Sequence, residues 1–107
     1  MSKRATRPRP SLEEVLQTLR DHLPDMRERY AVTSLGVFGS YVRGEARARS
    51  DLDLLVEFEQ APSFFKFVRL ERHLSELLGV KVDLVMKSAL KPYIGTRILN
   101  EVVPIEG

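Results

Sequence analysis

Residues 51–58 restrict the fold of this chain more than any other segment. They read Asp-Leu-Asp-Leu-Leu-Val-Glu-Phe, which predicts a strand over residues 52–58. Apart from the acids, apolar side chains alternate onto both faces of this strand. Such a strand is covered on both sides, or it is covered on one side and carries a site on the other. The segment therefore predicts a sheet with packed helices and singles out its first two acids.

A helix is expected to begin at Ser11, because Glu14, three residues later, completes a capping box. Apolar residues then recur at helical spacing: Leu12, Val15, Leu16, Leu19 and Leu23. Proline is poorly tolerated inside a helix, so a break is expected at Pro24. A second short helical piece should then run through Tyr30.

The rest of the chain alternates between extended and helical patterns. The expected elements are strands over residues 33–38 and 81–86, a short helix from Ser40, a helix over residues 63–78 ended by Gly79, a helix from Ser88 towards Asn100 bent near Pro92, and an extended end over residues 102–105. Phe64 and Phe67 are expected in the core, whereas Phe65 lies off the apolar face of its helix. This order predicts a mixed α/β domain with few strands.

The length and composition of the chain fit a single domain. Its 107 residues have room for one modest core, and 43% of them are hydrophobic. The absence of cysteine excludes a disulfide scaffold and Cys-ligated zinc. No segment approaches the about 20 apolar residues of a membrane span, and no signal-peptide core follows the basic start. A cytoplasmic protein without a membrane partner is therefore expected.

The first ten residues differ from the rest in charge. They hold four basic residues and no acid: Lys3, Arg4, Arg7 and Arg9. The remainder carries 13 basic and 15 acidic residues, a net charge of −2. We expect a flexible basic tail over residues 1–10 and one domain over residues 11–107. A nucleic-acid partner is compatible with this tail, but the charge of the domain does not require one.

Gly39 and Ser40 stand where the strand over residues 33–38 ends. Glycine lets the backbone approach a ligand closely, and a helix that begins at Ser40 directs N–H groups towards an anion. The same pair also fits a plain turn from a strand to a helix with a serine cap.

Asp51 and Asp53 lie two residues apart at the start of the strand over residues 52–58, so both carboxylates fall on one face. Two neighbouring acids repel each other unless a cation lies between them, and hard oxygen ligands suit Mg²⁺ or Mn²⁺. Exposed acids that discourage edge pairing are the alternative, against which the buried character of the strand argues.

Asp83 lies within the apolar sequence Val-Asp-Leu-Val of the strand over residues 81–86. An acid inside a buried strand is costly unless it is paired or bound to metal. On the strand beside Asp53 it would complete a three-carboxylate cluster with Asp51. Such a cluster, together with a phosphate-binding turn, is the arrangement that two-metal phosphoryl transfer needs.

Gly39-Ser40, ten further residues and Asp51-x-Asp53 match the G-S-x10-D-x-D signature. In this the chain resembles the DNA polymerase β-type nucleotidyltransferase superfamily, and Asp83 stands where that superfamily places its third carboxylate. Within the superfamily it is similar to the minimal nucleotidyltransferases, the antitoxin halves of HEPN/MNT toxin–antitoxin pairs. The resemblance implies a palm-like α/β fold: a small mixed sheet with helices packed on it.

The resemblance also implies roles for the site residues. Asp51 and Asp53 would ligate two Mg²⁺ ions, or Mn²⁺, and Asp83 would ligate the ion nearest the incoming hydroxyl and help to deprotonate it.

Gly39 and Ser40 would hold the β and γ phosphates of ATP. Arg43, about one turn along the same helix, is within reach of the phosphates, although a solvated surface arginine fits equally well.

The activity implied is transfer of AMP from ATP to a protein hydroxyl, a tyrosine of the partner HEPN ribonuclease, which is thereby neutralised. Two alternatives stay open: an antitoxin that inhibits by binding alone, and transfer to RNA or to a small molecule. The basic and aromatic residues after the strand that bears Asp83 are expected to contact the partner: Lys87, Lys91, Tyr93 and Arg97.

Overall fold

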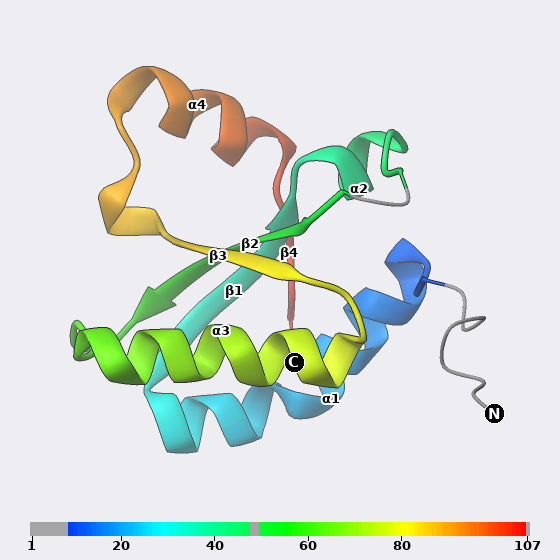
Figure 1. Cartoon of the computed structure of the whole chain (residues 1–107). Helices are drawn as coiled ribbons and strands as arrows, with labels where there is room; N and C mark the ends of the chain where they lie inside the picture. The colour runs from blue at the N-terminus through cyan, green and yellow to red at the C-terminus, as the bar shows by residue number, and fades with distance from the viewer. Residues whose placement is uncertain (1–8, 48–49, 107) are drawn as a thin grey trace, which may run out of the picture.

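The computed structural model describes residues 9–47 and 50–106. A four-stranded sheet forms its centre, with strand order β3-β2-β1-β4 (Figure 1). In chain order the elements are α1 (Leu12–Tyr30), β1 (Val32–Phe38), α2 (Ser40–Arg43), β2 (Leu52–Phe58), α3 (Phe64–Leu78), β3 (Val82–Met86), the 3₁₀ turn η2 (Lys87–Ala89), α4 (Pro92–Glu101) and β4 (Val103–Pro104). The expected small mixed sheet with packed helices is confirmed.

Strand β2 lies inside the sheet, as its apolar sequence predicts. It pairs antiparallel with β1 and parallel with β3, while β4 pairs antiparallel with the other edge of β1. Helices α1 and α3 cover one face of the sheet, and α4 stands on the opposite side (Figure 1). A parallel pair needs a crossover between its strands, and α3 supplies the crossover from β2 to β3.

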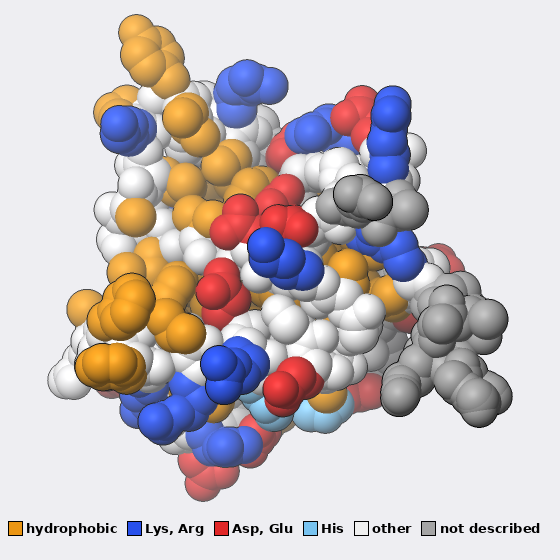
Figure 2. Space-filling model, in the orientation of Figure 1, with side chains coloured by type: hydrophobic (Ala, Val, Ile, Leu, Met, Phe, Trp, Pro, Cys, Tyr) orange, Lys and Arg blue, Asp and Glu red, His pale blue; other side chains and the backbone are white. Residues whose placement is uncertain are grey.

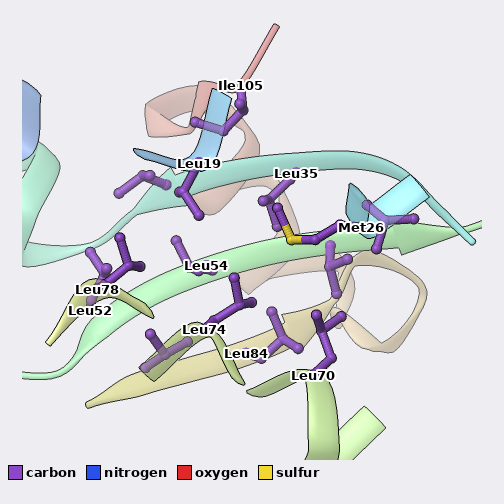
Figure 3. Packing of buried hydrophobic residues seen from close by; sticks show 14 of the residues in the cluster. Leu19, Met26, Leu35, Leu52, Leu54, Leu70, Leu74, Leu78, Leu84 and Ile105 are labelled. Atoms are coloured by element: carbon purple, nitrogen blue, oxygen red, sulfur yellow. The ribbon is translucent and has the colours of Figure 1, made fainter. Parts of the chain in front are cut away.

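The core lies between the sheet and the two long helices (Figure 3). Each helix buries one stripe at spacings of three or four residues: Val15, Leu19, Leu23, Met26 and Tyr30 from α1, and Leu70, Leu74 and Leu78 from α3. Leu52, Leu54 and Val56 of β2 meet these stripes and are fully buried. This packing fixes β2, and with it the aspartates at its start.

The break expected at Pro24 is wrong, because α1 continues through it from Leu12 to Tyr30. An interior proline costs about 3 kcal/mol. Leu23 and Met26 are buried on either side of it, at 1% and 0% exposure. Burial of two such side chains offsets a cost of this size, so packing holds the helix together.

The expectation that Phe64 is buried is also wrong. Phe64 and Phe65 form the first turn of α3, are 74% and 77% exposed, and contact each other edge to face. The buried stripe of α3 begins only at Leu70, and Phe67 packs against the core from its margin, beside Phe58. The first turn therefore extends past the core, which periodicity alone does not reveal.

The last helix begins later than Ser88. A 3₁₀ turn covers Lys87–Ala89, and Pro92 occupies the first turn of α4. A proline fits there because the N–H groups of a first turn have no partner within the helix. The extended end is β4, which adds an antiparallel strand to β1. None of the helices in the described part of the chain is long and apolar enough to cross a membrane.

Candidate active site

The turn after β1 brings backbone against a carboxylate. Gly39 has φ 83° and ψ −153°, a conformation that other residues rarely adopt, and it precedes the first residue of α2. A Cβ atom at this position would overlap the Asp53 carboxylate. Gly39 is therefore required both by its own backbone and by Asp53, and Ser40 follows it at the start of α2 with its side chain half-buried.

The sheet places two of the three predicted aspartates side by side, and the third lies at the start of the same strand. Asp53 pairs in register with Asp83 on the parallel strand β3 and with Phe38 at the end of β1. Asp51 comes directly before β2. Asp83 is exposed because it lies on the face of β3 opposite to the buried Val82 and Leu84, so the expected burial of this acid is wrong although its position beside Asp53 is as expected.

The electrostatics of Asp53 reflect this grouping. Partial burial, followed by the negative charges of Asp83 and Asp51, raises the pKa of Asp53 from its ordinary 3.8 to about 6. Arg43 opposes this rise, and Glu101 adds to it. A cation would relieve the repulsion, and carboxylate oxygens are the ligands that Mg²⁺ prefers. Across residues 9–47 and 50–106, however, no three acidic or histidine side chains are gathered closely enough to hold a metal ion.

Arg43 and Glu101 face each other across the turn. The Arg43 Nη1 atom donates to both oxygens of Glu101, at 3.0 and 3.1 Å, and its Nε atom donates to Glu45 at 2.9 Å. Glu101 also accepts from the Gly39 N–H at 2.8 Å. These glutamates raise the pKa of Arg43 further, so its charge is fixed.

Sequence reasoning missed Glu101, which lies 62 residues from its partner Gly39. The one sequence signal is weak: an acid in the last turn of a helix meets the negative end of the helix dipole, so it needs a compensating partner.

A cleft of about 230 Å³ opens beside these groups. Its lining combines the turn, Asp53 and one side of α4: Phe38, Gly39, Arg43, Asp53, Ile94, Arg97, Ile98 and Glu101. Figure 2 shows acidic side chains gathered near the middle of this face, with basic ones around them. A larger hollow of about 530 Å³ lies at the other ends of β2 and β3, between Phe58 and Met86, away from the aspartates.

Arg9 joins the chain that precedes α1 to the segment between α2 and β2. Its guanidinium lies over the Tyr41 ring, donates to the Tyr41 hydroxyl at 2.9 and 3.0 Å and to the Ser50 carbonyl at 2.7 Å, and also donates to the Arg47 carbonyl. Ser50 directly precedes Asp51. Residues 1–8 of the predicted tail lie outside the described residues, and the boundary at residue 11 stays a prediction.

Relatives support the same fold and chemistry. A protein adenylyltransferase of Thermococcus cleftensis, named MntA, is 55% identical over 93 residues, which cover 87% of this chain and 94% of the relative. A solved structure of a protein assigned as a minimal nucleotidyltransferase is 40% identical, with a TM-score of 0.73 over 88% of this chain and 95% of the other. The expected class of enzyme, a nucleotidyltransferase, is confirmed by these relatives.

A chain from the complex of a tri-AMPylated Shewanella oneidensis HEPN toxin with an MNT antitoxin is more distant. It is 20% identical, with a TM-score of 0.58 over 89% of this chain and 68% of the other, so this likeness shows the fold alone. The sequence model of the nucleotidyltransferase domain family matches residues 19–105 of this chain, which include the Gly39 turn and all three aspartates. The chain belongs to the nucleotidyltransferase family.

Proposed function

We propose that this protein transfers AMP from ATP to a hydroxyl of a partner protein, a tyrosine of a HEPN toxin, and thereby acts as an antitoxin in the cytoplasm. One observation carries the proposal: the register that sets Asp53 beside Asp83, directly against the Gly39 turn. The adenylyltransferase activity named for the Thermococcus relative supports the reaction. The HEPN complex with a chain of the same fold supports the kind of partner.

The residues in and beside the cleft form a metal-binding group and a phosphate-binding group. Asp51 and Asp53 would hold two Mg²⁺ ions, with Asp83 as a ligand of the ion nearest the acceptor. Their donor chemistry fits Mg²⁺, although the three side chains must move closer together to bind it. The ions, when bound, stabilise charge on the triphosphate and activate the attacking oxygen.

The phosphate side of the cleft is formed by the turn. Gly39 lets the turn pass close to Asp53 and leads into α2, Ser40 offers its N–H and hydroxyl, and Arg43 supplies positive charge. The acceptor oxygen would attack the α-phosphorus, the bond to the bridging oxygen would break, and pyrophosphate would leave. Asp83 is exposed on the edge strand, where it can take the proton of an incoming hydroxyl.

Catalysis and inhibition by binding alone differ in stoichiometry. If the protein is an enzyme, a small amount with ATP and Mg²⁺ should neutralise an excess of a HEPN ribonuclease and add AMP to it. Asp51→Asn should abolish both effects, because it removes a proposed metal ligand. Mass spectrometry of the partner and its residual ribonuclease activity are the measurements, with Glu76→Gln, an exposed acid on α3, as control.

The opposite result would favour the alternative. Inhibition that follows one-to-one titration, ignores ATP and survives Asp51→Asn would identify an antitoxin that works by occlusion. Modification of RNA or of a small molecule in place of the protein would show that the acceptor is wrong but that the protein does transfer nucleotides.

A further inference from the structure

Glu101 connects the end of α4 to both residues proposed to bind phosphate on the turn. Its carboxylate accepts from the Gly39 N–H at 2.8 Å and from Arg43 Nη1 at 3.0 and 3.1 Å. The three groups come from different elements: the end of β1, helix α2 and the last turn of α4. No other side chain described in the structure bonds to both Gly39 and Arg43.

The contact of Arg43 with Glu101 is better shielded from water than its contact with Glu45. The Glu101 side chain is 25% exposed, whereas the Glu45 side chain is 64% exposed. Exposed ion pairs contribute little because water screens them, and charge-assisted bonds in a partly buried position contribute more. Glu45 raises the pKa of Arg43 most, but Glu101 is the partner that also ties the arginine to the Gly39 turn.

The contacts leave phosphate donors available. A guanidinium carries five N–H donors, and Arg43 uses Nε for Glu45 and Nη1 for Glu101. Among the described residues, no hydrogen bond is formed by the Arg43 Nη2 atom, by the Ser40 N–H or by the Ser40 hydroxyl. Glu101 thus bonds to the turn and to one side of the arginine, while donors on Ser40 and Arg43 remain for an anion.

We propose that Glu101 is a positioning residue for ATP: it fixes the Gly39 turn and Arg43 in the arrangement that receives the β and γ phosphates. This inference rests on the proposed function. The opposite role is a carboxylate that occupies the anion site and must leave before ATP binds. The two roles predict opposite effects when the carboxylate is removed.

The test compares Glu101→Ala, Glu101→Gln and Glu45→Gln with the wild type. Loss of charge-assisted bonds of this kind should raise the Kd and KM for Mg²⁺·ATP about ten-fold in Glu101→Ala. The Kd for AMP, which lacks the β and γ phosphates, should stay within about two-fold, and kcat should change less than KM. Glu101→Gln keeps an acceptor for Gly39 and should lie between the wild type and Glu101→Ala. Glu45→Gln should resemble the wild type.

Calorimetry gives both Kd values, and thermal melting shows that each variant is folded. A Glu101→Ala variant that binds ATP as tightly as the wild type, or more tightly, would overturn the positioning role, and tighter binding would identify the competing carboxylate. Equal losses for ATP and AMP would also overturn it, since they would indicate a general structural role. A wild-type protein that binds no ATP would instead refute the proposed function itself.

Discussion

Asp53 is the residue at which the energetic cost of the site is most visible. Its pKa is raised from 3.8 to about 6 by burial and then by the charges of Asp83 and Asp51. Between these two pH values the folded protein binds more protons at Asp53 than the unfolded chain does. The free energy of unfolding therefore falls as pH rises from about 4 to about 6, and the cost is fully present at pH 7.

Asp53→Asn should remove this cost together with the activity. Relative to the wild type, we expect the variant to gain on the order of 1 kcal/mol at pH 7 and little at pH 4, after allowance for screening of a partly exposed carboxylate. Thermal melting at the two pH values measures the difference. The same variant should transfer no AMP. A stability difference that is independent of pH would contradict the assignment of the raised pKa, and full activity would remove Asp53 from the site.

At the scale of elements, Arg9 holds the segment that leads from α2 to Asp51. Its bonds to Tyr41 and Ser50 connect residues 32 and 41 positions apart in the chain. Arg9→Ala should lower the midpoint of thermal unfolding by several degrees, because it removes a cation–π contact and several hydrogen bonds at once. The variant should also transfer AMP more slowly, because the segment that positions Asp51 loses its contact with Arg9.

Arg29→Ala is the matched control, since Arg29 also lies over a tyrosine ring, at 5.6 Å, but within the described part of the chain its charged partner is only the nearby Asp25. We expect this control to shift stability by less than about 0.5 kcal/mol. If the two variants melt alike, the Arg9 contacts do not anchor the segment.

The elements that could be predicted from sequence are those with strong local patterns. The buried run of β2 and the capping box of α1 gave correct boundaries at Leu52, Phe58 and Ser11. The errors at Pro24 and Phe64 have another cause. Whether a helix tolerates a proline, or buries its first turn, depends on what the rest of the fold packs against it, and that is a tertiary property.

For the molecule as a whole, a sequence signature could indicate the acids but not their arrangement. Period-two spacing places Asp51 and Asp53 on one face, yet only the parallel register aligns Asp53 with Asp83. Glu101 could not be found in this way, because its contacts depend on how α4 returns to the end of β1. Contacts between distant segments have no local pattern, so this part of the site required the structure.

The small size of the domain also shapes how it meets an acceptor. The cleft is only about 230 Å³, and one wall is α4, which presents Tyr93 at 87% exposure and Ile94 at 54%. A partner must therefore supply part of the pocket and its own positioning. Aromatic and arginine side chains concentrate binding energy at interfaces, and Tyr93 and Arg97 lie on this wall or beside it.

Tyr93→Ala combined with Arg97→Ala should therefore weaken binding of the proposed HEPN partner by at least about ten-fold and slow its modification, because both side chains are lost from one contact surface. Binding of Mg²⁺·ATP should weaken less than binding of the partner, since the turn and the aspartates remain intact although Arg97 lines the cleft. Calorimetry with each ligand separates the two effects.

Glu28→Ala with Arg29→Ala is the control, on α1 across the sheet from α4 (Figure 1). Equal losses for partner and ATP would indicate a disturbed cleft, and an unchanged partner affinity would place the interface elsewhere, with the exposed Phe64 and Phe65 as the next surface to test.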